Sequence, residues 1–470
     1  MYTPEEAACR MNGELRVGGQ GGSLSPFFRV DSRDVQPGDV FVAMKGQNDD
    51  GHRYIRAAAK RGAGAVILEK SRRGEWFPEA DDLGITMIAA DDPERAVASL
   101  ARDWLAEISP TVVGITGSVG KTTTREFLYA ILKDNIKTHA AVKSYNTLIG
   151  CAMTILAMPP DTDVLLLELG TNHPGEIAEL VRYYPVTHGL ITEITDAHIE
   201  GLGSLEGVLS AKMEITESDA LRFLSYNSDN TMLNDAIHAW LSRLPEGRRV
   251  KAVGVGWAPS DATISDISLR LSDDGEAFLS FLLKTADAMY PCDARVFGKQ
   301  HARNIAYALI FALELGVSPE FALAAVSRLA TLSGRGKIYN LRRGGLLIDE
   351  SYNANPGSLS YALKNVLEAN VSQELRRVAI LGGMREMGAE SAHWHEVVMS
   401  RASLFDDIYL IGSEWDSFET QQAALRGRWE TTESFINEMN AVDFAGALIL
   451  LKGSRFYELE RLIPLLADVK

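Results

Sequence analysis

Short apolar runs, each about as long as one buried β-strand, recur along the chain and alternate with stretches of helical periodicity. Within residues 1–109 the apolar runs lie at 39–44, 63–68 and 85–90, and the helical stretches at 52–61 and 93–108. From residue 111 the pattern strengthens, with apolar runs at 111–116, 163–169 and 188–194 and helical stretches at 123–133 and 175–183. Apolar runs that alternate with helices predict parallel sheets covered by helices.

The second half of the chain changes its pattern twice. Residues 261–272 and 277–284 alternate like antiparallel strands, and a helical stretch at 301–315 ends at Gly316, a good helix stop. After a turn-rich stretch, further strand candidates lie at 345–351, 377–383, 407–412 and 446–453. A chain of 470 residues is too long for one compact core. We therefore predict an α/β fold with three domains: a small N-terminal α/β domain (1–109), a central parallel-sheet domain (110–332) and a C-terminal Rossmann-like domain (333–470).

Composition and charge exclude several classes of protein. With 46% hydrophobic and 23% charged residues the chain is typical of a globular protein, and no apolar run approaches the roughly 20 residues of a membrane helix. The N-terminus lacks a basic region followed by an apolar core, so we expect a cytoplasmic protein. A formal charge of −16 argues against nonspecific binding of nucleic acid. The cysteines, Cys9, Cys151 and Cys292, are too scattered for a disulfide framework or a metal site.

The segment VGITGSVGKTTT has the parts of a phosphate-binding loop. Gly117 and Gly120 would let backbone N–H groups converge on phosphate oxygens, Lys121 supplies charge and Thr122 a hydroxyl for Mg²⁺. The loop follows an apolar strand and opens a helix, where the helix dipole favours an anion. The general pattern also places a glycine at position 115, where this chain has isoleucine. The sequence still predicts a central domain of the P-loop type.

Two polar residues follow later apolar runs of the same domain. Glu168 and His198 come after strand candidates, where ligands gather in open α/β sheets. Alone, each would be interpreted as a helix cap or a surface residue, but next to a phosphate loop they are candidates for Mg²⁺ ligands or their neighbours. Lys212 lies soon after on a predicted helix, and by itself it would be a solvated helix lysine.

Polar loops also follow strand candidates in the last domain. One contains Glu350, Asn353 and Asn355 just before a proline, and such residues often form only a turn. Two others are basic, SGRGK with Arg335 and LLKGSRF with Lys452. A basic loop at the carboxyl end of a strand either clamps a carboxylate or phosphate or is merely solvated, and the residues alone leave both alternatives open.

Taken together, these segments resemble the Mur ligases, the ATP-dependent amide-forming enzymes of peptidoglycan synthesis in the bacterial cell wall. The resemblance covers nearly the whole chain and is carried by DSRDVQPGDVFVAMKGQNDDGHRYIRAAAKRGAGAVI, GITGSVGKTTT, ELGTNHPGEIAEL, AHIEGLGSLEGVLSAKMEI, FGKQHARNIAYAL, LIDESYNANPGSL, LGGMREMG and LLKGSRF. The family's own phosphate loop reads Thr-Gly-Ser-x-Gly-Lys-Thr without the earlier glycine. The isoleucine at position 115 is therefore expected.

The resemblance implies a reaction and its substrates. In this family the γ-phosphoryl group of ATP passes to a carboxylate, an amine attacks the acyl phosphate, and an amide, ADP and phosphate are formed with the help of Mg²⁺. The likeness is strongest to the members that join UDP-N-acetylmuramoyl-tripeptide to D-alanyl-D-alanine. It implies a UDP-linked muramoyl peptide and a dipeptide amine as substrates, and we expect a monomer.

The resemblance also implies roles for individual residues. Nucleotide binding is implied for Gly117, Ser118, Gly120, Lys121, Thr122, Thr123, Asn304, Arg335, Glu350, Asn353 and Asn355. Metal binding is implied for Thr122, Glu168, His198 and Lys212, the last as a carbamylated lysine. Catalytic roles are implied for Lys121, His198 and Lys212, and contact with the uridine diphosphate group for Ser32 and Arg33.

Three departures from the family pattern concern the choice of substrates. Tyr145 stands in place of the first of two asparagines, Glu193 in place of asparagine, and Gly383 in place of aspartate. Glu193 adds a negative charge that would either perturb substrate geometry or help bind a cation. Two alternatives therefore stay open: a ligase that couples another carboxylate to another amine, and an inactive nucleotide-binding relative. Lys121, with the candidate metal ligands intact, argues against the second.

The predicted layout implies a motion. The nucleotide would contact the second and third domains and the acid substrate the first, so catalysis requires domain closure about linkers near residues 109 and 333.

Overall fold

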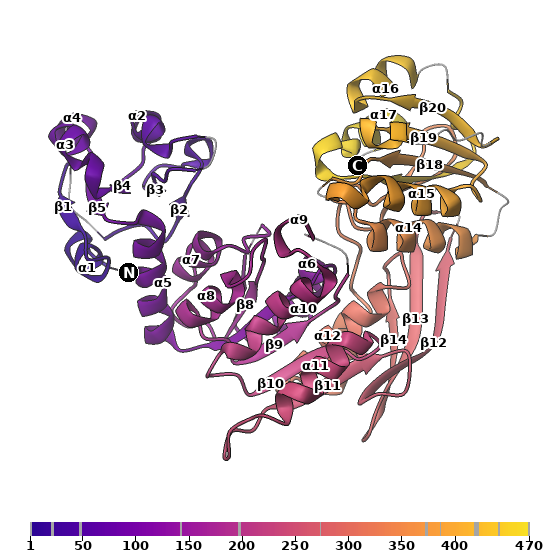
Figure 1. Ribbon diagram of the computed structural model, residues 1–470, viewed down its shortest axis with the longest axis horizontal. Helices are drawn as coiled ribbons and strands as arrows, with labels where there is room; N and C mark the ends of the chain where they lie inside the picture. Colours follow the sequence, from indigo (N-terminus) through magenta and orange to yellow (C-terminus); the bar gives the residue numbers. More distant parts are fainter. Residues whose placement is uncertain are drawn as a thin grey trace.

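The computed structural model describes residues 2–19, 23–46, 49–141, 143–195, 199–272, 274–371, 375–385, 387–417, 423–439 and 442–468. Figure 1 shows three sheets in succession, with the first and third at opposite ends of the molecule and the second between them. None of the described helices is long and apolar enough to cross a membrane.

The first sheet has the strand order β1-β5-β4-β3-β2. Its strands are β1 (Glu14–Arg16), β2 (Phe28–Arg29), β3 (Val40–Val42), β4 (Ala65–Glu69) and β5 (Thr86–Ala90), and β1 alone runs antiparallel to its neighbour. The helices of this part are α1 (Pro4–Arg10), α2 (Ile55–Lys60), α3 (Arg73–Trp76), α4 (Ala80–Leu83) and α5 (Pro93–Ile108). The start of α5 is fixed by Asp92, whose carboxylate accepts a hydrogen bond from the Arg95 N–H, and by Pro93 in the first turn.

Among the described residues the second sheet contains ten strands, in the order β14-β13-β12-β11-β10-β9-β6-β8-β7, with β17 also paired to β12. They are β6 (Thr111–Thr116), β7 (Thr138–Ala140), β8 (Val164–Glu168), β9 (His188–Ile191), β10 (Phe223–Asn227), β11 (Lys251–Gly256), β12 (Ala262–Leu271), β13 (Ala277–Thr285), β14 (Met289–Ala294) and β17 (Asn370–Val371). Its helices are α6 (Lys121–Leu132), α7 (Leu148–Leu156), α8 (Glu176–Tyr183), α9 (Ile199–Leu202), α10 (Leu205–Met213), α11 (Thr231–Leu241), α12 (His301–Glu314) and α13 (Pro319–Val326). The antiparallel pairing of β12 with β13 confirms the two strands predicted at 261–272 and 277–284, and β14 is a further strand that was not predicted.

The third sheet has the order β15-β16-β21-β18-β19-β20. Its strands are β15 (Lys337–Asn340), β16 (Gly345–Asp349), β18 (Arg376–Gly382), β19 (Asp407–Ile411), β20 (Leu425–Trp429) and β21 (Ala447–Lys452), and β15 alone is antiparallel to its neighbour. The helices here are α14 (Pro356–Glu368), α15 (Ser391–Ala402), α16 (Thr432–Glu438) and α17 (Ile463–Leu466).

The second and third sheets share one hydrophobic core. This core runs from β6 and α6 through α12 to the inner face of the third sheet, where it includes Leu346, Ile348 and Leu448. In addition, β17 follows α14 of the third domain in sequence but pairs with β12 of the second sheet. The predicted three-domain α/β architecture is confirmed, and the boundaries at 109 and 332 stay predictions.

Candidate active site

A cleft of about 780 Å³ has walls from both the second and the third part of the chain. It brings together most of the predicted site residues: Ser118, Gly120, Lys121, Thr122, Thr123, Glu168, Asn304, Arg335, Glu350, Asn353 and Asn355. Many of these residues follow the carboxyl ends of β6, β8 and β16, where open α/β sheets bind their ligands. Gly117 belongs to the same loop as Ser118 without lining the cleft, and His198 falls outside the described residues.

The loop between β6 and α6 has a backbone that only glycine permits at two positions. Gly117 has a φ of +134°, and a Cβ atom there would lie 2.1 Å from Thr192 Oγ1. Gly120 has a φ of +90° and directly precedes α6. The glycines of the predicted phosphate loop therefore let the backbone turn sharply into α6. The first turn of α6 then faces the cleft with backbone N–H groups that have no partner within the helix, and the helix dipole favours an anion there.

Lys121 is the first residue of α6 and lies against the loop. Its ammonium donates hydrogen bonds to the carbonyl oxygens of Gly117 and Ser118. Burial lowers the pKa of Lys121 to about 8, with Glu168 opposing the shift and Arg335 adding to it. The ammonium is thus held by neutral carbonyl groups, and a phosphate group in the cleft would supply a strong negative counter-charge.

Glu168 and Thr122 lie side by side at the ends of β8 and the phosphate loop. The Thr122 hydroxyl donates a hydrogen bond to Glu168 Oε2 over 3.0 Å. Glu168 Oε1 has no hydrogen bond within the described part of the chain, although Arg125 Nη1 lies 3.1 Å from it. A buried carboxylate oxygen with an unfilled acceptor position beside a hydroxyl fits Mg²⁺, which usually takes one or two carboxylates and completes its shell with phosphate oxygens and water.

Lys212 is buried in α10, with 1% of its surface exposed, so it is not the solvated helix lysine that its position alone suggests. Burial and then Lys121 lower the pKa of Lys212 to about 7, and Glu214 and Glu176 oppose this shift. A substantial fraction of the amine is therefore neutral near pH 7, which is the form that can react with CO₂. Lys212 does not line the cleft, but its charge reaches Lys121, which does.

The third domain supplies the opposite wall. Arg335 lies over the ring of Tyr352, 4.1 Å from its centroid, and its Nη1 is 3.5 Å from Thr123 Oγ1 of α6. Lys452 is buried, with its ammonium 3.4 Å from Glu350 Oε2. The basic loop that contains Arg335 therefore reaches the central domain. Lys452, in the other basic loop, is buried and forms an ion pair with Glu350, a predicted nucleotide-binding residue.

The three predicted asparagines have local partners as well as places in the cleft wall. Asn304 Oδ1 accepts a hydrogen bond from Thr124 Oγ1 over 3.3 Å, which ties α12 to α6. Asn355 caps α14, because its side chain accepts from the N–H of Ser358 over 2.8 Å. The sequence left open whether this loop is only a turn; Asn355 both caps a helix and lines the cleft.

Ser32 and Arg33 lie apart from this cleft. They line a separate hollow of about 990 Å³ in the first part of the chain. Arg33 donates to both carboxylate oxygens of Asp31, which lowers the pKa of Asp31 to about 2. The structure therefore separates the predicted nucleotide and uridine-diphosphate residues into two hollows.

Two of the three departures are accommodated locally. A Cβ atom at Gly383 would lie 2.4 Å from Glu414 Oε2, so the space of an aspartate side chain is occupied by a carboxylate from the end of β19. Tyr457 donates a hydrogen bond to the same carboxylate. Tyr145 does not line the cleft, whereas its neighbours Ser144 and Asn146 do. A carboxylate therefore still lies beside position 383, and the polar residues on either side of Tyr145 line the cleft.

Several cleft or neighbouring residues were not predicted from the sequence. His301 and Arg303 of α12 line the cleft together with Trp257, which follows β11, and Arg125 Nη1 lies 3.1 Å from Glu168 Oε1. Burial, with a further contribution from Arg335, lowers the pKa of His301 to about 4, so this imidazole is neutral near pH 7. Arg125 carried a usable signal, because it follows Lys121 by four residues and so shares its face of α6. His301 and Arg303 lie in the segment FGKQHARNIAYAL that carries the resemblance, but no role was assigned to them.

Comparison with known proteins agrees with this geometry. Family models match three successive parts of the chain: the Mur ligase family catalytic domain at residues 26–105, the Mur ligase middle domain at 115–312, and the Mur ligase glutamate ligase domain at 334–455. The chain belongs to the Mur ligase family, and the resemblance inferred from its motifs is confirmed.

Individual relatives cover nearly the whole chain. The UDP-N-acetylmuramoyl-tripeptide--D-alanyl-D-alanine ligase of Escherichia coli (strain K12) is 29% identical over 464 residues, covering 97% of this chain and 96% of the relative. The enzyme of the same name from Bacillus subtilis (strain 168) is 27% identical over 446 residues, covering 92% and 91%. The crystal structure of the MurF ligase of Thermotoga maritima in complex with ADP is 26% identical, with a TM-score of 0.77 over 93% of this chain and 96% of that chain.

Proposed function

We propose that the protein is an ATP-dependent ligase that joins UDP-N-acetylmuramoyl-tripeptide to D-alanyl-D-alanine in peptidoglycan synthesis. The observation that carries this proposal is the convergence, in one cleft, of the phosphate loop, Glu168 and the third-domain residues Arg335 and Glu350. Relatives of this name match 92% and 97% of the chain, which supports the particular pair of substrates.

The chemistry follows from what a carboxylate lacks. A carboxylate is a poor electrophile with a poor leaving group, so its carbon–oxygen bond must first be activated. Transfer of the γ-phosphoryl group of ATP to the carboxylate oxygen, with release of ADP, gives an acyl phosphate. The amine then attacks the carbonyl carbon and phosphate leaves. The protein's task is to position the reactants and to offset the negative charge that gathers between them.

The residues of the cleft suit these tasks. Lys121 and the N-terminus of α6 would bind the phosphate oxygens, and Arg335 would approach the nucleotide from the third domain. Thr122 and Glu168 would hold Mg²⁺, which when bound screens the repulsion between the triphosphate and the incoming carboxylate. His198 and a carbamylated Lys212 are proposed as further ligands, since a carbamate converts a buried cation into a carboxylate-like group.

Ser32 and Arg33 would hold the uridine diphosphate end of the acid substrate. Because their hollow is separate from the nucleotide cleft, the first and third domains would have to approach each other during catalysis. Solution scattering should show a smaller radius of gyration with an ATP analogue and the acid substrate together than without them. Identical scattering curves would contradict this closure.

The decisive experiment measures phosphate release by the purified protein with ATP and Mg²⁺. We expect release only when UDP-N-acetylmuramoyl-tripeptide and D-alanyl-D-alanine are both present, and mass spectrometry should detect the joined product. A parallel series replaces the dipeptide by single amino acids and by other dipeptides. If another amine stimulates release and D-alanyl-D-alanine does not, the proposed substrate pair is wrong although the ligase chemistry stands.

A further inference from the structure

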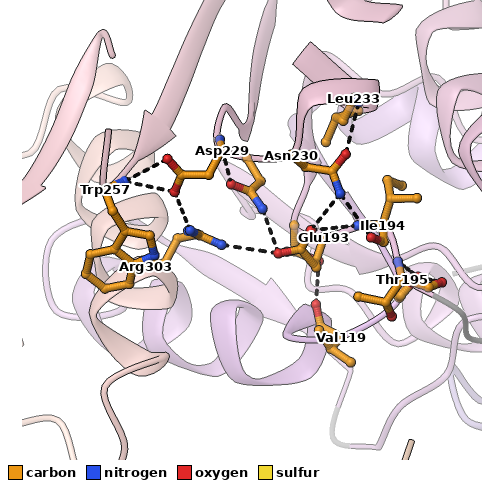
Figure 2. A network of polar contacts seen from close by, with 12 residues as sticks. Val119, Glu193, Ile194, Thr195, Asp229, Asn230, Leu233, Trp257 and Arg303 are labelled. Atoms are coloured by element: carbon orange, nitrogen blue, oxygen red, sulfur yellow. Dashed lines mark hydrogen bonds and ion pairs between the residues drawn. The ribbon is translucent and has the colours of Figure 1, made fainter. Parts of the chain in front are cut away.

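Glu193 brings a negative charge to the cleft wall at the end of β9, and Figure 2 shows how this charge is met. Asn227 Nδ2 and Arg303 Nη1 donate to its Oε2 over 2.6 and 3.2 Å. Asn230 Nδ2 and the Ile194 N–H donate to its Oε1 over 3.0 and 3.1 Å. A carboxylate has about four acceptor positions, and each is filled here by a neighbour. Glu193 is therefore not an open ligand for a cation.

Arg303 joins Glu193 to a second carboxylate. Its Nη2 lies 2.5 Å from Asp229 Oδ2, and the same carboxylate accepts the N–H of Trp257 over 2.8 Å (Figure 2). The guanidinium also lies over the ring of Trp257, 5.3 Å from its centroid. With only 12% of the Arg303 side chain and 17% of the Glu193 side chain exposed, this pair is largely shielded from water. It ties the ends of β9, β10 and β11 to α12.

The same segment holds the phosphate loop through its backbone. The Ser118 N–H donates to the carbonyl oxygen of Glu193 over 2.7 Å, and the Thr192 hydroxyl donates to the carbonyl oxygen of Val119 over 2.6 Å. The residue after Arg303 is Asn304, which accepts the hydrogen bond from α6 described above. Movement of Glu193 would therefore displace the phosphate loop at Ser118, and movement of Arg303 would displace the contact between α12 and α6 that follows the loop.

We propose that Glu193 and Arg303 are a coupled pair of positioning residues that hold the phosphate loop and the adjoining cleft wall in the geometry that binds nucleotide. This proposal rests on one part of the proposed function, the binding of a nucleotide in the cleft. Arg303→Met leaves both Glu193 and Asp229 without the guanidinium that pairs with them, whereas Glu193→Gln leaves Arg303 paired with Asp229. In the double variant only Asp229 loses its counter-charge, so its penalty is smaller than the two single penalties combined. The ion pair between Asp229 and Arg303 would not by itself hold the loop, because the carbonyl oxygen that accepts the Ser118 N–H belongs to Glu193.

The test measures binding of ADP with Mg²⁺ to the full-length protein by calorimetry, without acid or amine. We expect Arg303→Met to weaken binding by about tenfold and Glu193→Gln by about threefold, and the double variant to lose less than the product of the two. Arg303→Lys should fall between wild type and Arg303→Met, because an ammonium cannot bridge two carboxylates as a guanidinium does.

Lys251→Met is the matched control. Lys251 Nζ lies 2.6 Å from Glu314 Oε2, and this pair joins the same strand and helix, β11 and α12, at their opposite ends. Its removal should leave ADP affinity unchanged. In the ligation assay, Arg303→Met should raise KM for ATP by about the same factor as the dissociation constant, while kcat at saturating ATP changes by less than about twofold.

Two results would overturn the proposal. In the first, Arg303→Met lowers the unfolding temperature but binds ADP as tightly as wild type, which makes the pair structural only. In the second, the fold-losses of ADP affinity in the two single variants multiply to give the loss in the double variant, which shows that the two residues are not coupled. Because ADP binding needs no turnover, a wild-type protein that binds ADP but joins no acid to an amine would overturn the proposed function and leave this inference standing.

Discussion

The two sides of the phosphate loop use buried charge in opposite ways. Toward β8, Glu168 keeps one oxygen without a hydrogen bond among the described residues, and the pKa values of Lys121 and Lys212 are lowered by burial. Toward β9 and β10, Glu193 is saturated by four donors, and Arg303 bridges it to Asp229. The first group of charges is incompletely compensated by the protein, and the second is compensated internally.

We propose that this difference separates ligand-binding charges from positioning charges. A charged group that is left without full compensation in the folded protein destabilises it and gains most from a ligand of opposite charge or from a metal ion. A charge that is saturated by its neighbours gains little from a ligand and instead fixes the geometry of the elements that carry its partners. Hence we propose different roles for Glu168 and Glu193, although both are carboxylates at strand ends beside one loop.

The largest effect is expected from removal of the cation on the β8 side. Lys121→Met keeps most of the apolar stem but removes the charge that would meet the phosphate groups. We expect the rate of ATP-dependent ligation to fall by about 10³-fold or more, because electrostatic stabilisation is the main contribution available to phosphoryl transfer. Phosphate release under saturating substrates measures it. Activity within tenfold of wild type would show that the loop is not catalytic.

The next effect concerns stability. Arg125 and Glu168 are each 1% exposed, with Nη1 and Oε1 3.1 Å apart. Arg125→Met leaves the carboxylate buried without its main counter-charge, which should lower the free energy of unfolding by about 3 kcal/mol. The double variant with Glu168→Gln should recover most of this loss. Denaturant unfolding without Mg²⁺ measures both, and an equal loss in the two variants would mean that packing of the arginine side chain, rather than its charge, is responsible.

The sequence predicted one side of the cleft far better than the other. Gly117, Gly120, Lys121 and Thr122 are adjacent in the chain, so the phosphate loop is a local pattern whose backbone demands show in the residues themselves. The array of Glu193, Asp229 and Arg303 has no such signature. Its members are distant in sequence and meet only because β9, β10 and α12 meet in the fold.

The same contrast holds for the fold. Long buried strands such as β6 and β8 lie where uninterrupted apolar runs predicted them. The pairing of β17 with β12 was not predicted, because a two-residue strand carries no periodicity and its partner lies about 100 residues away in the sequence. Glu193 was recognised as unusual from the resemblance, yet its neutralisation by Arg303 required the structure.

A smaller effect should appear in the dependence of stability on pH. The pKa of Lys212 is about 7 in the folded protein and 10.5 when unperturbed, so between these values the unfolded chain binds more protons than the folded one. The penalty for burying the cation is complete below pH 7 and decreases as the pH rises toward 10.5. Stability should therefore rise by about 1 kcal/mol per pH unit from this group.

Thermal unfolding from pH 7 to 9, in CO₂-free buffer without nucleotide, tests this slope. Lys212→Met should abolish the part of the rise that begins at pH 7, whereas Lys251→Met, at an exposed pair, should leave it in place. If wild type and Lys212→Met show the same slope, the ammonium of Lys212 is better compensated than the burial of its side chain indicates, and the contrast between the two sides of the loop weakens.

The smallest effect is expected where charges are paired but exposed. Lys143 and Asp34 join the loop before α7 to the first part of the chain, with Nζ and Oδ2 3.0 Å apart and side chains 62% and 49% exposed. Lys143→Met should change stability by less than about 1 kcal/mol, and the change should vanish in high salt, because water and ions screen such a pair. Unfolding at low and high ionic strength measures it. A loss of unfolding free energy that is insensitive to salt and as large as that of Arg125→Met would mean that burial does not set the strength of the ion pairs in this protein. The distinction between ligand-binding and positioning charges would then lose its physical basis.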